Sequence, residues 1–449
     1  MGKLTRVFDI LLGLVFGDEG KGKIVDYLAH QYHIVARFQG GPNAGHTLWV
    51  AAQKYVLHHI PSGILHEKVM NFIGKGVVIS PVILMNEIVG LESRGVSATK
   101  NLVIASSCPV TLPTHRVLEA ISEVKRGNDA IGSTLKAITP TYVDFYGRQA
   151  LLFKDFVSCQ DLYSLRLYAL HCEVIRQTDE SILAQALDLL EKPSQFLVQT
   201  AKERLINFLG REMSALEEAR TFFFKHRHLI VADSYAADAF YAGKSVLAEG
   251  AQGCELSIGS SNYPFNTSSY VSSASACEQL GISPLDIREV IGVMKCYSTK
   301  VGGGDLLGEI LDDNVAEALV ETGDEFGSTT GRKRKPGWNL VDPIGNAIRR
   351  NGVTRVIITK CDIPFLANIS AIGLYIGGLE EKHLCMIPVQ PHSNPNAPLG
   401  TSRTITQFVQ LLEKNLNAIP GVSVQVTHIT NGPNREDILS TRDPIFEGV

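Results

Sequence analysis

The stretch that most constrains this chain lies between residues 7 and 32, where a glycine-rich turn separates two apolar segments. Residues 10–15 form the continuous apolar run that a buried parallel strand needs, and residues 24–28 have helical spacing. The turn between them reads Gly-Asp-Glu-Gly-Lys-Gly-Lys over residues 17–23. The backbone N–H groups of such a turn, the N-terminus of the following helix and two lysines all favour an anion. The sequence therefore predicts a phosphate site.

This turn differs from the usual P-loop at one position and carries an acid. Gly17, Gly22 and Lys23 fit the P-loop spacing, but Ile24 stands where that pattern has a Ser or Thr hydroxyl on Mg²⁺. Asp18 lies inside the predicted cradle, where phosphate groups would repel its carboxylate. We therefore expect Asp18 both to hold a cation and to accept a proton from a substrate.

The composition of the chain narrows the classes of function. With 45% hydrophobic and 20% charged residues over 449 positions, the chain has the composition of an ordinary globular protein. A formal net charge of -4 gives no broad basic field, so we do not expect a nucleic acid partner. The eight cysteines are scattered without a CxxC pair, and no apolar stretch has the length of a membrane span. We expect a cytoplasmic protein that does not contact a membrane.

Two further strand-like segments each run into a loop with polar side chains. Residues 34–38 precede a loop of three glycines and a proline that carries Asn43 and His46. We expect His46 to act as an acid or as a donor to developing charge. Residues 245–249 precede Gln252, whose amide lies between glycines. Because open α/β sheets bind ligands at the carboxyl ends of their strands, we expect these loops to line one crevice.

A long helical stretch interrupts the alternation of strands and loops. Between residues 148 and 242 there is one glycine and one proline, while Leu, Ala, Glu and Lys recur at helical spacing. We interpret residues from about 150 to 242 as a helical insertion. The predicted fold class is α/β, with a large, mostly parallel central sheet that starts with a P-loop-like strand, loop and helix. We expect a single domain over residues 1–449.

The second half of the chain carries signals for a purine base and for carboxylates. Residues 356–358 form an apolar run that ends in Thr-Lys-Cys-Asp. Asp362 can accept hydrogen bonds from both the ring N–H and the exocyclic amine of guanine, while the stem of Lys360 covers the base. Adenine offers no such pair of donors, so this motif favours GTP. The basic cluster at residues 332–335 follows two hydroxyl side chains, and its arginines suit carboxylates.

Together these motifs resemble those of the adenylosuccinate synthetase family. The resemblance extends from Gly17 to Pro444 and consists of GDEGKGK, GGPNAGHT, IPSGIL, EGAQG, STTGRKRKPGW, TKCD and TNGP, in the family's order. It implies a large α/β domain, a homodimer, and a GTP-dependent ligase that joins L-aspartate to IMP with Mg²⁺. In that reaction the γ-phosphoryl group of GTP moves to the 6-oxygen of IMP. The amine of aspartate then displaces phosphate and gives adenylosuccinate.

The resemblance also implies roles for individual residues. Asp18 would take the proton from purine N1 and, with the backbone of Gly45, bind Mg²⁺. His46 would stabilise the moving phosphoryl group, and Gln252 would hold the purine. The other matches are, for GTP, Gly17, Gly20, Lys21, Gly22, Lys23, Arg334, Lys360, Asp362, Thr430 and Gly432; for IMP, Asn43, Thr134, Thr267, Arg332 and Arg148 from the second subunit; and for aspartate, Thr329, Thr330, Arg332 and Arg334.

Two stretches depart from the pattern that the family usually has. After the Thr matched by Thr134 the family reads Gly-Arg-Gly-Ile-Gly-Pro, whereas residues 135–140 are Leu-Lys-Ala-Ile-Thr-Pro and lack the three glycines. Where the family reads Asp-Ile-Asp-His-Gly, residues 257–261 are Ser-Ile-Gly-Ser-Ser. Both stretches flank the monophosphate side, so a paralogue that uses another 6-oxopurine monophosphate is one alternative. A GTP-binding relative that does not ligate is another.

Overall fold

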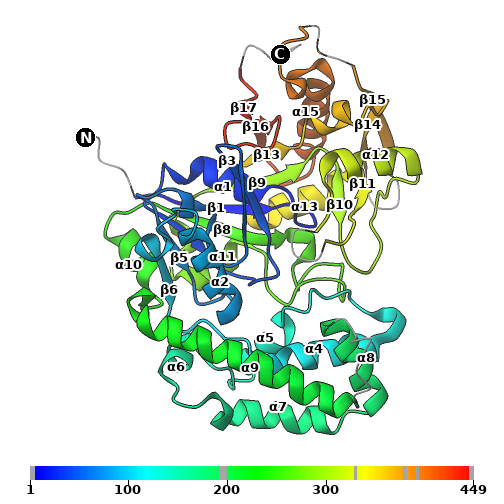
Figure 1. Ribbon diagram of the computed structural model, residues 1–449. Coiled ribbons are helices and arrows are strands. Elements are labelled where there is room, and N and C mark those ends of the chain that lie inside the picture. Colours follow the sequence, from blue (N-terminus) through cyan, green and yellow to red (C-terminus); the bar gives the residue numbers. More distant parts are fainter. Residues whose placement is uncertain are drawn as a thin grey trace.

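The computed structural model describes residues 6–191, 200–327, 331–377, 382–390, 392 and 394–443, and these residues build one large sheet with surrounding helices (Figure 1). Ten strands of the described chain form that sheet, and all neighbouring pairs are parallel except the pair at one edge, β16 with β17. Across the sheet the strands are β17 (Ile438–Ser440), β16 (Gln425–Thr430), β13 (Arg355–Thr359), β9 (Ile287–Lys295), β1 (Phe8–Gly13), β8 (Val246–Gly253), β2 (Ile34–Arg37), β5 (Met70–Ile73), β6 (Leu102–Ala105) and β7 (Ile230–Val231). The predicted α/β fold class is confirmed.

Strand β1 lies at the centre of this sheet. Its six residues are all buried, and it pairs in parallel with β8 on one side and with β9 on the other. A strand covered on both faces needs apolar residues at successive positions, which is the pattern that the sequence has here. The strand ends at Gly13, earlier than predicted, because Leu14 and Val15 already belong to the buried start of the turn.

The loops that carry the predicted site residues leave the sheet at one edge. Those that follow strands come after β1, β2, β8, β13 and β16, and parallel strands present their carboxyl ends on the same side. Thr134, Arg332 and Arg334 lie on loops that follow helical segments. Helix α1 (Lys21–Ala29) starts directly after the glycine-rich turn. A hairpin of β3 (His46–Val50) and β4 (Gln53–Leu57) extends the loop after β2. The topology therefore brings together segments that lie far apart in the sequence.

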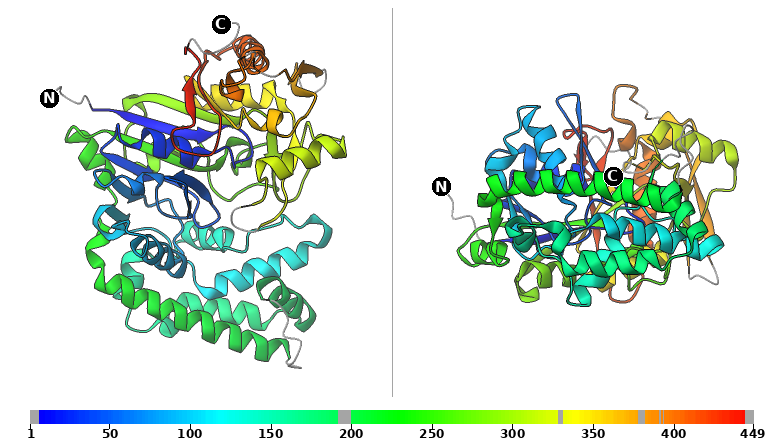
Figure 2. Two further views of the ribbon diagram at one scale, coloured as in Figure 1. Left: turned by 45° about the horizontal axis from the view of Figure 1, so that its top comes forward. Right: turned by 60° about the horizontal axis from the view of Figure 1, so that its bottom comes forward.

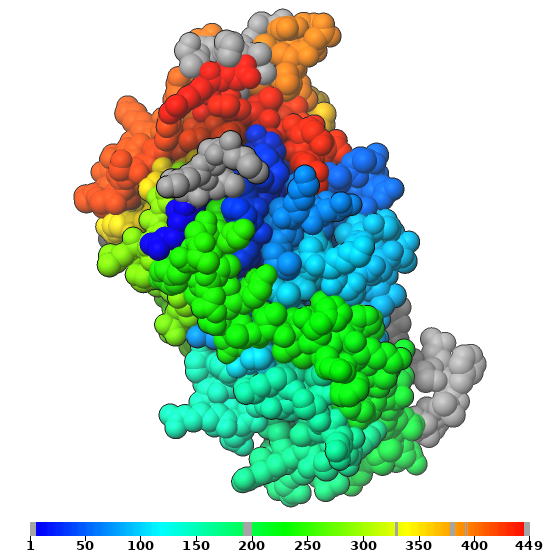
Figure 3. Space-filling view, turned by 90° about the vertical axis from the view of Figure 1, so that its left-hand side faces the viewer, coloured from blue at the N-terminus to red at the C-terminus, as the bar shows by residue number. Residues whose placement is uncertain are grey.

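A helical layer occupies one end of the molecule and lies under the sheet in the left view of Figure 2. Figure 3 shows its atoms, coloured cyan to green, gathered at that end. Helix α4 packs on α8 through a shared apolar cluster, so the helical layer begins before residue 150. The layer consists of α4 (Pro113–Arg126), α5 (Ile138–Tyr146), α6 (Phe153–Ser158), α7 (Arg166–Arg176), α8 (Glu180–Leu190) and α9 (Ala201–Lys225).

The remaining elements cover the sheet or form small sheets beside it. No described helix combines the length and the apolar character that crossing a membrane requires. The other helices are α2 (Pro81–Glu92), α3 (Ala98–Asn101), α10 (Tyr235–Tyr241), α11 (Ser273–Leu280), α12 (Asp313–Gly323), α13 (Val341–Asn351), α14 (Ile363–Leu366) and α15 (Arg403–Leu416). The other strands are β10 (Ser298–Lys300), β11 (Lys335–Gly337), β12 (Asn339–Leu340), β14 (Ala371–Ile376) and β15 (His383–Pro388).

Candidate active site

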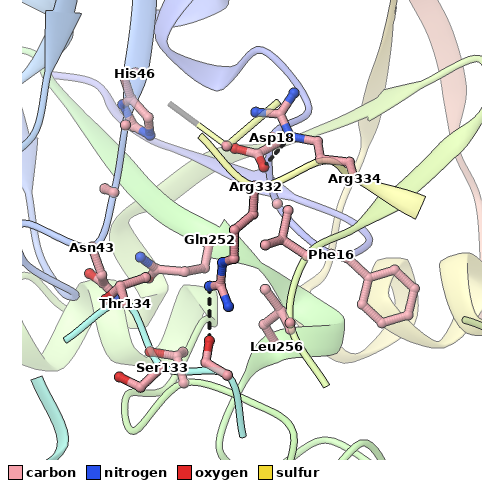
Figure 4. A pocket seen from close by; sticks show the side chains of 18 of the residues that line it. Phe16, Asp18, Asn43, His46, Ser133, Thr134, Gln252, Leu256, Arg332 and Arg334 are labelled. Carbon is pink, nitrogen blue, oxygen red and sulfur yellow. Dashed lines mark hydrogen bonds and ion pairs between the residues drawn. The ribbon is translucent and has the colours of Figure 1, made fainter. Parts of the chain in front are cut away.

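One cavity of about 1170 Å³ opens at the carboxyl edge of the sheet, and Figure 4 shows part of its wall. Arg148 does not line it, and Thr329 and Thr330 lie outside the described residues. The predicted site residues that line it are Gly17, Asp18, Gly20, Lys21, Gly22, Lys23, Asn43, Gly45, His46, Thr134, Gln252, Thr267, Arg332, Arg334, Lys360, Asp362, Thr430 and Gly432.

The turn after β1 has the left-handed backbone that its glycines permit, with φ of 84° at Gly17 and 81° at Gly20. Asp18 also has a positive φ, 58°, and Asp tolerates this region better than most residues. The carboxylate of Glu19 fixes the turn from inside. It accepts hydrogen bonds from the backbone N–H groups of Val15 (3.1 Å) and Gly17 (2.8 Å). This role of Glu19 was not predicted from the sequence, where its signal is a second acid inside a glycine turn.

The two lysines of the turn are both engaged by protein groups. Lys21 is buried, and its ammonium donates to Glu19 at 2.7 Å. Lys23 donates to the backbone carbonyls of Gly432 (2.6 Å) and Asp437 (2.9 Å), so it ties the turn to the loop after β16. Burial lowers the pKa of Lys23 to about 8, which leaves the side chain cationic at neutral pH. Of the two lysines predicted to bind phosphates, Lys23 therefore lies between the turn and the loop after β16, and Lys21 lies within the turn.

Asp18 points into the cavity, where it forms an ion pair with Arg334 (Figure 4). The distance from Nε of Arg334 to Oδ2 of Asp18 is 2.8 Å, and Nη1 of the same arginine lies 2.6 Å from the buried carboxylate of Glu325. Burial opposes the charge of Arg334, but Asp18 and Glu325 outweigh it and raise the pKa of the guanidinium. The predicted base is thus held by an arginine that was predicted for aspartate and GTP.

The carboxylate of Glu325, next to this ion pair, contacts three cationic side chains. Its carboxylate is fully buried and accepts from Lys295 (3.0 Å) and Lys360 (2.8 Å) as well as from Arg334. Burial raises the pKa of Glu325, but the three cations outweigh burial and lower it. Burial also lowers the pKa of Lys295 to about 8. The carboxylate of Glu325 therefore connects Lys360 of the predicted guanine pocket to Arg334, which holds Asp18. This connection was not predicted from the sequence.

His46 lies at the start of β3, and its buried ring contacts a carboxylate on β8. The distance from Nδ1 of His46 to Oε1 of Glu249 is 2.5 Å, and Ser62 donates to Glu249 through Oγ (2.6 Å) and through its backbone N–H (2.7 Å). Burial lowers the pKa of His46, although Glu249 works against that shift. The neutral ring then carries its proton on Nδ1, toward Glu249, which leaves Nε2 for a ligand. Close packing by the turn holds the ring, since a Cβ added to Gly22 would lie 2.7 Å from Cβ of His46.

Apart from Nε of Arg334, which forms the ion pair with Asp18, three buried polar atoms in the cavity wall have no hydrogen-bond partner among the described residues. They are Oδ1 of Asn43, Nε2 of Gln252 and Oγ1 of Thr267, and all three residues were predicted for IMP. Most buried polar groups in proteins are paired, so an unpaired set on one wall indicates a polar ligand. Across the cavity Arg332 donates to the backbone carbonyl of Gly132 at 2.9 Å, which is the lower of the two dashed contacts in Figure 4.

The family model described as adenylosuccinate synthetase matches residues 10–377 of this chain. The chain belongs to the adenylosuccinate synthetase family. The enzyme of that name from Christiangramia forsetii is 43% identical over 453 residues, which covers 96% of this chain and 99% of the relative. The enzyme from Porphyromonas gingivalis is 38% identical over 448 residues, which covers 96% and 98% of the two chains.

Solved structures give the same result at the level of the fold. The fully ligated adenylosuccinate synthetase from Plasmodium falciparum has a TM-score of 0.73 and 25% identity, covering 97% of this chain and 99% of that chain. A cyanophage S-2L succinoaminodeoxyadenylate synthetase bound to dGMP and dATP has a TM-score of 0.61 over 98% of this chain and 96% of that chain. At 19% identity this second likeness shows the fold alone.

The segment that lacks the usual glycines of adenylosuccinate synthetases keeps a left-handed backbone. The φ angles are 54° at Leu135 and 62° at Ala137, two of the positions where the family usually has glycine. Two carboxylates of α4 support this conformation. Glu119 accepts from the N–H of Ala137 (2.6 Å) and from the hydroxyl of Ser133 (2.8 Å), and Glu123 accepts from the N–H of Ser133 (3.1 Å). The loop therefore holds its shape through α4 rather than through glycine.

This conformation should carry a measurable strain. A left-handed backbone costs a non-glycine residue about 1–2 kcal/mol in the folded state. Glycine avoids this cost, but it makes the unfolded chain more flexible, and that entropy cancels part of the gain in stability. We expect Ala137→Gly to raise the free energy of unfolding by about 0.5–1 kcal/mol in urea titrations. The matched control is Ala184→Gly within α8, which should lower it by about 1 kcal/mol. Destabilisation in both variants would contradict the assignment of strain to this loop.

Proposed function

We propose that this protein is a GTP-dependent C–N ligase that joins L-aspartate to IMP and gives adenylosuccinate, GDP and phosphate in AMP biosynthesis. The observation that carries the proposal is a single cavity in which Asp18, His46 and three unpaired polar atoms face one another. Membership in the adenylosuccinate synthetase family supports the same reaction. We treat residues 1–449 as one catalytic unit that includes the helical layer.

The chemistry needs activation of a poor electrophile. A 6-oxopurine has no leaving group at C6, so the oxygen must first be phosphorylated. Asp18 accepts the N1 proton of IMP, which makes the 6-oxygen nucleophilic toward the γ-phosphorus of GTP, and GDP leaves. Once His46 is protonated on both ring nitrogens, Nε2 donates to the phosphoryl oxygens as charge develops on them. The amine of aspartate then attacks C6, its proton is lost, and inorganic phosphate leaves with the former 6-oxygen.

Two parts of the cavity suit the two ends of GTP. The turn at residues 17–23 offers backbone N–H groups at the start of α1 for the phosphates, with Lys21 and Lys23 beside it. At the other end of the cavity Asp362 is buried, and burial raises the pKa of its carboxyl group. The charged carboxylate therefore needs hydrogen-bond donors from a ligand. Guanine supplies two such donors. The walls around this carboxylate are Lys360, Thr430 and Gly432.

The remaining residues suit IMP and aspartate. Asn43, Gln252 and Thr267 present the unpaired atoms to IMP, and Thr134 lies on the same wall. Arg332 and Arg334 offer planar donors for the carboxylates of aspartate, with Thr329 and Thr330 preceding them in the chain. We propose a homodimer in which Arg148 of each subunit reaches the IMP of the other. All eight cysteines are free, which supports a cytoplasmic site of action.

Oxygen donors at the cavity wall fit Mg²⁺. The carboxylate of Asp18 and the backbone carbonyl of Gly45 would hold the ion, which takes few protein ligands and completes its shell with phosphate oxygens and water. When bound, Mg²⁺ neutralises charge on the phosphates. Arg334 engages Oδ2 of Asp18, so Oδ1 of the same carboxylate would be available to the ion.

The proposal is tested by the products that the purified protein forms. With GTP, Mg²⁺ and aspartate, we expect mass spectrometry to show a succinylated product from IMP, and little from GMP, dGMP or dIMP. The 2-amino and deoxy acceptors test the alternative that the changed segments at residues 135–140 and 257–261 alter the substrate. A product from one of these acceptors and none from IMP would overturn IMP as the substrate. No product with any acceptor would indicate a relative without ligase activity.

Asp362 should decide which nucleotide donates the phosphoryl group. We expect Asp362→Asn to raise the KM for GTP about tenfold or more, because the amide cannot accept from both donors of guanine and leaves one unmatched. ITP lacks the exocyclic amine, so its KM should change less. Initial rates with GTP, ITP and ATP measure this. Equal use of ATP and GTP by the unmodified protein would rule out Asp362 as the determinant.

A further inference from the structure

A compact group of polar side chains lies in the helical layer, beyond the residues assigned to substrates. Asp144 on α5 accepts hydrogen bonds through Oδ2 from Nε2 of His115 on α4 (2.7 Å) and from Nε2 of His171 on α7 (2.9 Å). Both histidine rings are buried, and Asp144 and His171 line the edge of the cavity. Three helices are therefore joined by one carboxylate oxygen.

The hydrogen bonds of this group argue against a metal ion, although its ligand atoms lie within 4.8 Å of one another. Nδ1 of His115 faces the backbone N–H of Leu112 at 2.8 Å and must accept from it. The proton of the neutral ring is then on Nε2, the atom that a metal would need as a lone pair. Nδ1 of His171 lies 2.8 Å from the hydroxyl of Thr114. The ring nitrogens of both histidines therefore have hydrogen-bond partners without a metal. The role of the group is to fix α5 to α4 and α7.

Fixing α5 matters most at the end where Arg148 follows. The segment before α5 has its own support, because Glu119 and Glu123 of α4 hold residues 132–137. The segment after α5 turns directly at Asp144, whose backbone carbonyl accepts from the N–H of Gln149 at 2.8 Å. Tyr142 also holds α5, through its hydroxyl, which donates to the backbone carbonyl of Gly76 at 2.7 Å. Asp144 lies nearer to Arg148, one helical turn before it, and its side chain anchors the C-terminal end of the helix.

Arg148 is placed to act outside its own subunit. It is exposed, it has a φ of 62°, and no hydrogen bond or ion pair engages its guanidinium within the part of the chain that the structure describes. The exposed face of α5 beside it carries Tyr146, which is 68% exposed, and Val143, which is 64% exposed and lies at the rim of the cavity. Large exposed apolar side chains next to a free arginine are typical of a surface that meets a second subunit.

We infer that Asp144 is a positioning residue that acts across the dimer: through His115 and His171 it sets the exit of α5 and so aims Arg148 at the IMP phosphate of the partner subunit. The inference rests on the proposed homodimer and its shared IMP site. It predicts that damage at Asp144 appears in the other subunit's site rather than in its own.

The first experiment compares two substitutions of Asp144. Asp144→Ala removes the acceptor, and we expect the KM for IMP to rise about tenfold or more, since a charge-assisted contact to phosphate is lost. The kcat and the KM for GTP should stay within about threefold, which a general loss of structure would not produce. Asp144→Asn retains an oxygen that can accept both N–H groups, and its KM for IMP should lie near that of the unmodified protein. Equal effects of Ala and Asn, or a parallel change in every parameter, would contradict the inference.

The second experiment uses mixed dimers isolated with two different affinity tags. An Asp144→Ala subunit is paired with an Asp18→Asn subunit, which lacks the base but has an intact α5. The one working base then receives Arg148 from the subunit with Asp144. We expect the low KM for IMP to return with about half of the normal activity per dimer, as one of two sites is restored. A KM that stays high would overturn the inference.

Two control pairs separate this inference from the proposed function. Arg148→Ala paired with Asp18→Asn should also restore the low KM, because the arginine comes from the partner. Thr134→Ala paired with Asp18→Asn should not, because that side chain acts in its own subunit. If the Arg148 pair fails, the shared site of the proposed function is wrong and the inference falls with it. If the Arg148 pair succeeds and the Asp144 pair fails, only the inference is wrong.

If Asp144→Ala does not fold, His171→Ala, which removes one of the two hydrogen bonds, takes its place in both experiments.

Discussion

Asp18→Asn is expected to lower the kcat for ligation by about 10²–10⁴ or more while GTP still binds. The amide has nearly the same shape, and Asn tolerates the left-handed backbone that Asp18 adopts at φ 58°, so the turn keeps its geometry. The variant can neither accept the N1 proton nor bring a negative charge to Mg²⁺. It also loses the charge that pairs with Arg334 at 2.8 Å. The chemical step should therefore suffer far more than the binding of GTP.

The measurement is single-turnover ligation beside GTP titration by calorimetry. The matched control is Asp324→Asn, because Asp324 lines the same cavity, also has a positive φ (48°), and is an exposed acid with no role in the proposed chemistry. Its kcat should stay within about threefold of the unmodified protein. If Asp18→Asn retains more than about a tenth of the activity, Asp18 is not the base.

The phosphate turn and its neighbours could be predicted from the sequence because their signals are local. An apolar run, a glycine turn and a helical pattern in residues 10–28 are sufficient to place Asp18 at the end of a buried strand. The parallel sheet then brings Gln252 to the same edge, since β8 pairs directly with β1. Local patterns combined with one topological rule therefore predicted that the loops carrying Asp18 and Gln252 meet at one cavity.

The carboxylates that hold this wall could not be predicted in the same way. Glu249 contacts His46, which lies 203 residues away in the sequence. Glu325 contacts Lys360 and Arg334, which lie 35 and 9 residues away. Neither glutamate belongs to a sequence motif that indicates this role. A buried acid can be recognised only when the cations around it are known. Leu135 gives the converse case, because its backbone is left-handed although the glycine is missing. Its N–H donates to the hydroxyl of Ser133, and Glu119 of α4 holds that hydroxyl.

His46→Asn is expected to lower kcat by about 10²–10³ with little change in the binding of GTP or IMP. The asparagine amide can still donate to Glu249 in the place of Nδ1, which lies 2.5 Å from that carboxylate, but nothing replaces Nε2. The loss of kcat therefore measures what Nε2 of His46 contributes as the donor to the phosphoryl group. Ser62→Ala is the matched control, because it removes another donor to Glu249 and leaves the ring in place. Equal losses in the two variants would mean that His46 only supports the structure.

The pH dependence of kcat tests the same assignment through Glu249. Burial lowers the pKa of His46 in this structure, so the ring is neutral at pH 7 and needs a proton before Nε2 can donate. Phosphates bound beside the ring raise its pKa, as Glu249 does, and activity should fall as the pH rises through that value. Glu249→Gln removes the negative charge, lowers the pKa of His46 further, and should shift this basic limb to lower pH. A limb that stays in place or moves to higher pH would show that Nε2 does not act as the proton-bearing donor.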